Sequence, residues 1–131
     1  IMVEEVKAHE GPDYAEWMHV EASSDDGNKV SAGGTFFGGH PWIVRINGRN
    51  VEAVAEGVLF LMNNVDKPGM VGYIGSLMGE HQVNIANMSL NRDAAGGEAL
   101  MILNLDHEPP PALLEKVEGD SNITNVKVVS I

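Results

Sequence analysis

The sequence predicts an α+β chain in which a small all-β meander is followed by a ferredoxin-like βαββαβ unit. Residues 1–56 carry short strand-like segments that are separated by glycine-rich turns. From residue 57 onward the apolar pattern becomes strand, helix, strand, strand, helix, strand. Hydrophobic residues make up 44% of the 131 residues, which is enough for a packed core. We therefore expect a β-rich fragment over residues 1–56 and an α+β domain over residues 57–131.

The first unit is expected to have four or five strands, because runs with a period of two alternate with turn residues. Asp26-Gly27-Asn28 and Asn47-Gly48 are hairpin sequences, since their central residues tolerate positive φ. Gly33 and Gly34 lie inside an extended run and predict a β-bulge or a bend. The expected strands are residues 3–11, 14–22, 29–37, 42–46 and 50–56.

The strands of the second unit are more apolar than those of the first. "VLFLMNNV" (58–65) is a near-continuous apolar run, typical of a strand buried on both faces. Residues 83–90 alternate imperfectly, and "ALMILNL" (99–105) is apolar again, with a hairpin predicted at Gly96-Gly97. Residues 123–131 form the last expected strand. Such a sheet needs cover for its edges and open face, either from another chain or from the preceding β unit, and we expect a homodimer.

Two helices are expected between these strands. The first has apolar residues at helical spacing from Met70 to His81. Pro68 suits its first position, where the missing N–H is not needed, and Asp66 is placed to cap its free amides. The second helix covers residues 111–119, after a run of three prolines.

The first helix also carries a stripe of small residues opposite its apolar stripe. Each glycine inside a helix costs about 1 kcal/mol relative to alanine. Either the glycines are simply tolerated, or the bare face lets a partner or a ligand approach closely. The small residues are Gly69, Gly72, Gly75, Ser76 and Gly79.

Composition excludes several classes of partner. The net charge of -11 disfavours nucleic acid and anionic membrane surfaces as partners. The sequence has no cysteine and no apolar stretch long enough for a membrane span, which is compatible with a cytoplasmic location. Ile1-Met2 leads directly into a strand-like pattern, so we expect the chain to be a piece of a longer protein.

No catalytic set and no metal site are predicted. The five histidines are scattered and form no HExxH motif, so no cofactor is expected in this chain either. "GGTFFGG" (33–39) is followed by a strand and not by a helix, which disfavours a phosphate cradle. Arg45, with Arg49 and Lys29 nearby, is either a candidate for a weak anion site or an ordinary strand-surface charge.

Two polar residues flank the first predicted helix. Asp66 precedes it and Asn84 follows it, so the two lie at opposite ends and cannot easily reach one ligand within one chain. A two-fold dimer can bring them together if first strands or first helices pair antiparallel. Such a seam would suit a small zwitterion, with Asp66 for its ammonium group and Asn84 for its polar ends. Alternatively, Asp66 only caps the helix and Asn84 only turns the chain.

The segments "VDKPGMVGYIG" (65–75), "VNIANMSLNRD" (83–93) and "GGEALMILNLD" (96–106) resemble an ACT domain, a module that senses amino acids. The preceding residues 33–57 resemble the linking β domain of the longer bacterial D-3-phosphoglycerate dehydrogenases. The resemblance therefore assigns residues 1–56 to part of an intervening domain, and residues 57–131 to the ACT regulatory domain of that enzyme family.

This resemblance implies an effector site that composition does not show. In the family, ACT domains pair side by side and bind L-serine at the seam for feedback inhibition. The implied contacts are Asn64, Val65, Asp66, Lys67, Pro68 and Gly69 of one chain, with Asn84 of the other. Relatives often place histidine or tyrosine at position 64, which leaves the effector's identity open. The family's anion-binding positions in the linking domain fall on Trp42 and Val54, which are not basic.

The resemblance also implies what the full enzyme does. It oxidises 3-phosphoglycerate with NAD at the first step of L-serine biosynthesis. The resemblance also implies that the full enzyme is a homo-oligomer, and we expect a tetramer. This fragment would sense and assemble without catalysing. Two alternatives stay open: the regulatory region of the β-type subunit of iron–sulfur L-serine dehydratase, and an ACT module that mediates assembly without binding an effector.

Overall fold

The computed structural model describes residues 1–8 and 17–131. Its internal contacts divide the chain into two compact units, Ile1–Ala55 (unit 1) and Glu56–Ile131 (unit 2), which are described separately. The parts of the predicted strands that fall on residues 9–16 lie outside the described residues.

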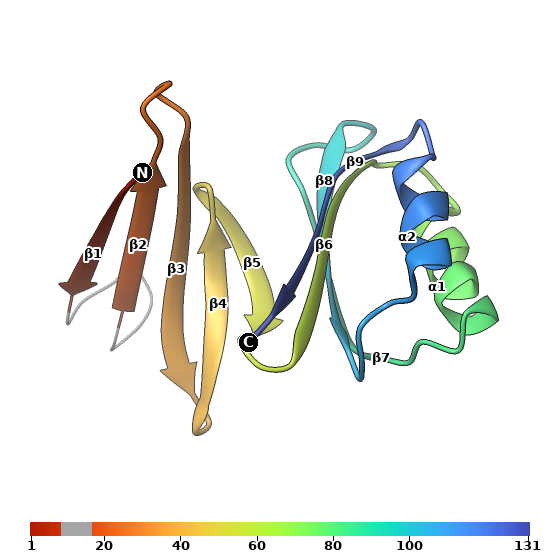
Figure 1. Cartoon of the computed structure of the whole chain (residues 1–131), viewed down its shortest axis with the longest axis horizontal. Helices are drawn as coiled ribbons and strands as arrows, with labels where there is room; N and C mark the ends of the chain where they lie inside the picture. Colours follow the sequence, from red (N-terminus) through yellow and green to blue (C-terminus); the bar gives the residue numbers. More distant parts are fainter. Residues whose placement is uncertain (9–16) are drawn as a thin grey trace. The chain divides into compact units, whose positions relative to one another are not determined.

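Unit 1 is an antiparallel meander whose strands follow their order in the sequence, β1-β2-β3-β4-β5 (Figure 1). The predicted all-β meander is therefore confirmed. The register shifts between Gly33 and Gly34, where the sequence predicts a bulge or a bend. The strands are β1 (Met2–Ala8), β2 (Trp17–Ser23), β3 (Lys29–Phe37), β4 (His40–Ile46) and β5 (Arg49–Val54).

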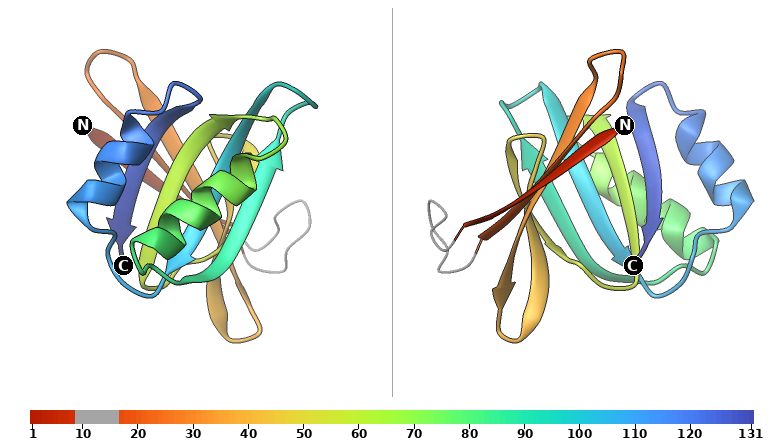
Figure 2. Two further views of the ribbon diagram at one scale, coloured as in Figure 1. Left: turned by 90° about the vertical axis from the view of Figure 1, so that its right-hand side faces the viewer. Right: turned by 60° about the vertical axis from the view of Figure 1, so that its left-hand side comes forward.

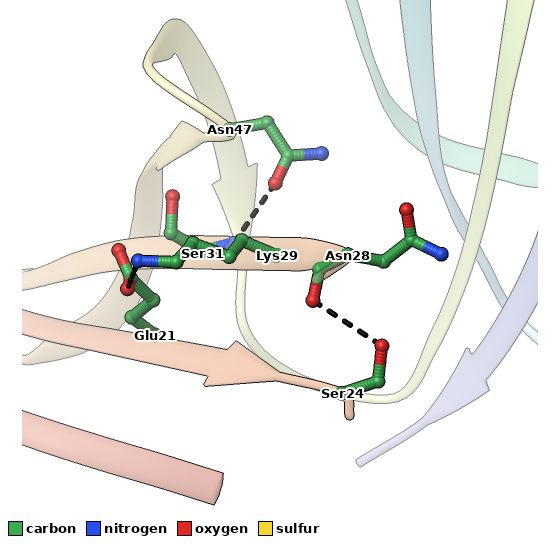
Figure 3. A network of polar contacts seen from close by, with 6 residues as sticks. All are labelled: Glu21, Ser24, Asn28, Lys29, Ser31 and Asn47. Carbon is green, nitrogen blue, oxygen red and sulfur yellow. Dashed lines mark hydrogen bonds and ion pairs between the residues drawn. The ribbon is translucent and has the colours of Figure 1, made fainter. Parts of the chain in front are cut away.

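The hairpins predicted at Asp26-Gly27-Asn28 and Asn47-Gly48 form between β2 and β3 and between β4 and β5. Asn47 and Gly48 both have positive φ, 48° and 81°, as a type I′ turn requires. The side chain of Asn47 also reaches β3, where its Oδ1 accepts a 2.8 Å hydrogen bond from the Ser31 amide (Figure 3). In the same view, the Lys29 ammonium lies 3.0 Å from the Glu21 carboxylate across β2 and β3.

Unit 2 has the predicted ferredoxin-like order of elements. Its sheet is antiparallel with the order β7-β8-β6-β9, and both helices lie on one face of it (Figure 2). No helix among the described residues is long and apolar enough to cross a membrane. The elements are β6 (Val58–Val65), α1 (Met70–Glu80), β7 (Ile85–Arg92), β8 (Glu98–Leu105), α2 (Pro111–Glu118) and β9 (Ile123–Ser130).

The core of unit 2 lies between this sheet and its two helices. The apolar positions of α1 that the sequence spaces at helical intervals, Met70, Ile74, Leu77 and Met78, are all buried there. They pack against alternate residues of the two central strands, and Leu113 and Val117 of α2 belong to the same cluster, as do Val83 and Ile123. Burial of this apolar surface is the main source of stability for the unit.

The predicted start of the first helix is wrong. The helix begins at Met70, and Pro68 with Gly69 forms a type II turn before it: Gly69 has φ 93° and ψ -15°, and the Met70 amide donates to the Lys67 carbonyl at 3.5 Å. Asp66 does not cap the helix, since no side chain accepts a hydrogen bond from the first backbone amides of α1. A proline followed by glycine favours this turn more strongly than it favours the first turn of a helix.

Candidate functional site

The segment that connects β6 to α1 is held on both sides. On one side, the Asp66 amide donates to the Gly97 carbonyl of the β7–β8 hairpin at 2.8 Å. On the other side, the Val65 amide donates to the Asn122 carbonyl at 2.9 Å, and the Lys67 ammonium donates to the Asn122 Oδ1 at 2.9 Å. The loop over residues 66–69, which we call the effector loop, is therefore fixed by contacts with two distant turns.

Asp66 directs its carboxylate to the β7–β8 hairpin. Its Oδ2 accepts one hydrogen bond from Arg92 Nη1 and one from the Gly96 amide, both at 3.2 Å. The Asp66 side chain is 16% exposed, whereas the Arg92 side chain is 59% exposed. The predicted ligand for an ammonium group is thus ordered by a cation and an amide of its own chain.

Asn64 lies on the helix-covered face of β6 and is 3% exposed. Its Nδ2 donates to the Val65 carbonyl at 2.9 Å, and its Oδ1 is buried without a hydrogen-bond partner among the described residues. A buried amide oxygen without a donor is unfavourable by about 1–3 kcal/mol. Position 64 therefore presents an unfilled acceptor two residues before Asp66.

Asn84 lies at the other end of α1. Its Nδ2 donates to Asp106 Oδ2 at 2.8 Å, and the Asp106 amide donates back to the Asn84 carbonyl at 3.2 Å. Because β6 and β7 are both antiparallel to β8, they run parallel, so Asp66 after β6 and Asn84 before β7 lie at opposite ends of the sheet. One chain does not bring these two side chains together.

The sheet order rules out one of the two predicted ways of pairing. β6, the first strand of unit 2, is hydrogen-bonded to β8 on one side and to β9 on the other. It has no free edge, so first strands cannot pair between two chains. Within unit 2 as described, the strands with a single neighbour are β7 and β9.

A second polar network, which the sequence analysis missed, supports the effector loop. Hydrogen bonds from the Asn122 amide and from its side chain, at 2.8 and 2.9 Å, lower the pKa of the Asp120 carboxyl, with smaller contributions from Tyr73 and Lys67. Desolvation, reinforced by Asp120, raises the pKa of the Tyr73 hydroxyl. Lys67 and Asn122 are 55 positions apart, so sequence spacing holds no signal for this contact.

Arg45 of unit 1 is already engaged within its own sheet. Its guanidinium lies 5.3 Å from the centre of the Trp17 ring, and its Nη2 donates to Asn50 Oδ1 at 3.3 Å. Trp17 in turn lies over Gly33, where an added Cβ would come 2.2 Å from the ring. The nearby Lys29 is paired with Glu21. An anion site at Arg45 stays a prediction.

Across the part of the chain that is described, no three acidic or histidine side chains gather closely enough to hold a metal ion. The polar groups around the effector loop include the carboxylates of Asp66 and Asp120, the Arg92 guanidinium, the Lys67 ammonium and several amides. Such a set suits hydrogen bonding and charge pairing with a small polar molecule.

Comparison with known protein families identifies unit 2. The family model of the ACT domain matches residues 58–121, from the first strand of unit 2 to the turn before its last. Residues 58–121 form an ACT domain. The effector loop and Asn84 both lie within the matched ACT region.

Similarity to individual proteins extends beyond the ACT domain. The chain is 35% identical to D-3-phosphoglycerate dehydrogenase of Methanocaldococcus jannaschii over 118 residues, which cover 90% of the chain and 22% of that protein. It is 33% identical to the enzyme of Mycobacterium tuberculosis over 133 residues, or 100% of the chain and 25% of the enzyme. It is 35% identical to the D-3-phosphoglycerate dehydrogenase of Archaeoglobus fulgidus over 133 residues, which cover 98% of the chain and 25% of that protein.

The chain therefore spans about a quarter of the length of these relatives. The predicted resemblance to the regulatory part of D-3-phosphoglycerate dehydrogenase is confirmed, since the relatives carry that name and match both units. The region of the chain that matches these dehydrogenases includes the ACT domain of residues 58–121.

Proposed function

We propose that this chain is the regulatory part of a D-3-phosphoglycerate dehydrogenase and that it binds L-serine between two ACT domains. The parent enzyme would oxidise 3-phosphoglycerate with NAD in other domains, at the first step of L-serine biosynthesis. Binding of L-serine would favour one arrangement of the ACT pair and so lower the activity of the catalytic domains. We also propose a cytoplasmic location, with which the absence of cysteine is compatible.

The observation that carries this proposal is the free edge of β7. Met88 and Leu90 on this strand are 42% and 41% exposed, and β8 is the single neighbour of β7 in the described structure. A free, partly apolar edge favours strand addition from a second copy. If β7 pairs antiparallel with its copy about a two-fold axis, the Asp66 end of one chain meets the Asn84 end of the other.

The ligand class follows from the groups that such a pair would bring together. Asp66 offers a carboxylate for an ammonium group, and Asn84 offers the oxygen of an exposed side-chain amide. The effector loop contributes the region around Lys67, Pro68 and Gly69. A small zwitterion matches these charges, and L-serine adds a hydroxyl for the remaining polar groups.

Calorimetry tests this function directly. Titration of L-serine into the chain should release or absorb heat with a stoichiometry that approaches one molecule per protomer. The Asp66→Ala variant should give no binding heat while its sedimentation remains that of a dimer. Asp25→Ala, which removes a carboxylate from a turn of unit 1, is the matched control and should bind like the parent chain.

Two other results would redirect the proposal. If no amino acid gives heat while the dimer persists, the chain is an assembly module. The contact that the Asp66 carboxylate already makes with Arg92 is compatible with this alternative. If glycine or another amino acid binds and L-serine does not, Asn64 has changed the effector. The serine dehydratase alternative has less support, because both units match D-3-phosphoglycerate dehydrogenases.

A further inference from the structure

We propose that Arg92 binds the carboxylate of the effector and that Asp66 and Arg92 together form one receptor for an amino acid zwitterion. This inference rests on the proposed function and adds a specificity-determining residue to it. Arg92 is the last residue of the edge strand β7, and its guanidinium contacts the carboxylate that the ammonium group of the effector is expected to use.

The geometry of the pair leaves both partners with free binding capacity. Arg92 Nη1 and the Gly96 amide both donate to Oδ2 of Asp66, at 3.2 Å each, and no other described residue donates to Oδ1. A guanidinium has five N–H donors, and Arg92 uses a single one here. An ammonium group can therefore bind Oδ1 while a carboxylate binds the remaining donors of Arg92.

The charge of the chain favours a local cation as the partner of the effector carboxylate. With a net charge of -11, the chain disfavours an added anionic group, and a cation at the site offsets that repulsion. The effector loop and the adjacent hairpin offer two cations, and Lys67 is directed to Asn122 at 2.9 Å. Asp93 and Glu98 of the same hairpin add negative charge, and Glu98 accepts from Asn63 at 2.6 Å. Arg92, with its side chain 59% exposed, is the cation that a ligand can reach.

The contact between Arg92 and Asp66 contributes little to the stability of the fold. A single contact at 3.2 Å with an arginine this exposed contributes about 0–1 kcal/mol to folding. The strand register also places Arg92 opposite Ala99, which is itself opposite Asn64, so the three residues lie in one row on one face of the sheet. Ala99 is small, and Asn64 ends in the unfilled acceptor. The row thus joins a cation, a small residue and an acceptor beside Asp66.

Two ligands and one substitution test this assignment. L-serine and L-serinamide share the ammonium and the hydroxyl, but serinamide has no carboxylate. At about pH 6, where both amino groups are protonated, calorimetry should show that the parent chain prefers L-serine by tenfold to a hundredfold, about the value of a charge-assisted hydrogen bond. Arg92→Gln should lose most of the affinity for L-serine and keep that for L-serinamide, so that the preference disappears.

The control is Lys127→Gln, which removes one positive charge from β9, the strand at the opposite edge of the same sheet. It should keep the preference, and all three proteins should sediment as dimers. If Arg92→Gln binds both ligands as the parent does, the inference is overturned. It is also overturned if Arg92→Gln binds both ligands more tightly, because Arg92 would then compete with the ammonium group of the ligand for Asp66. If the parent chain binds neither ligand, the proposed function itself fails and this inference fails with it.

Discussion

Gly69 determines where the first helix of the ACT domain begins. Its φ of 93° lies in the left-handed region, where a side chain is disfavoured, and it ends the type II turn that Pro68 starts. The turn places the effector loop beside the β7–β8 hairpin, so that Asp66 contacts Arg92 and Gly96 and does not contact the helix.

We predict that Gly69→Ala lowers the free energy of unfolding by about 1 kcal/mol, because alanine is disfavoured at positive φ. Gly75→Ala is the matched control in the exposed helix interior, where an added Cβ meets no atom within 4 Å. It should raise stability by about 0.5–1 kcal/mol. Urea unfolding measures both changes, and equal effects of the two substitutions would contradict this account of the turn.

Asp120 should make stability depend on pH. Hydrogen bonds from Asn122 hold its pKa below the ordinary value of 3.8, so the stabilisation is complete above that value and is lost as the pH falls through the lowered pKa. The difference in unfolding free energy between the parent chain and Asp120→Asn should therefore be constant near neutral pH and shrink below pH 3.8. A difference that does not change on acidification would show that the charge of Asp120 is not involved.

At the same scale, the sequence predicts the polar residues but not their partners. Asp66, Lys67 and Asn84 are visible as polar residues that flank a helix. Their contacts with Arg92, Asn122 and Asp106 are not visible in the sequence, because each contact depends on the packing of turns that are distant in sequence. Arg92 could have been found as a basic residue next to a hairpin loop in a very acidic chain.

At the scale of elements, the two edge strands of unit 2 differ in their neighbours. The C-terminal end of β7 contacts the effector loop through Arg92, whereas β9 lies beside β6 at the other edge. The order of elements was predictable because the apolar periods of the strands and helices differ clearly. The strand order in space was not, since several orders satisfy the same pattern, and this is why pairing through the first strands was a wrong expectation.

The edge strands allow a matched test of the dimer. Leu90→Lys places a charge on the exposed edge of β7, and in a two-fold pair the same charge comes from both chains, which disfavours pairing. Val128→Lys places a charge on the edge of β9 in the same way. The two positions are similarly exposed, Val128 by 36% and Leu90 by 41%. Analytical ultracentrifugation should show monomers for Leu90→Lys and dimers for Val128→Lys. The reverse result would move the interface to β9.

At the scale of the whole molecule, the two units have unequal cores. The core of unit 2 joins both helices to the central strands β6 and β8. The buried apolar residues described in unit 1 are Val44, Val51 and Ala53, while Phe36 and Phe37 are 65% and 74% exposed. The small core of unit 1 was not predictable from the sequence, because its strands carry many apolar residues.

Hydrogen exchange on the intact chain should report this difference. Amides of β6 and β8 should exchange most slowly, because these strands have neighbours on both sides and carry the core of unit 2. Amides of β1, an edge strand of unit 1, should exchange much faster. Equal protection of β1 and β8 would show that the two units unfold as one.

The most direct test of the central claim is a mixing experiment between two inactive variants. If each site uses Asp66 of one chain and Asn84 of its partner, then Asp66→Ala and Asn84→Ala dimers each bind L-serine poorly. After the chains exchange, half of the dimers are mixed and each has one intact site, so calorimetry should recover about a quarter of the parental sites. A mixture that binds no more L-serine than the two variants measured separately would contradict a shared site.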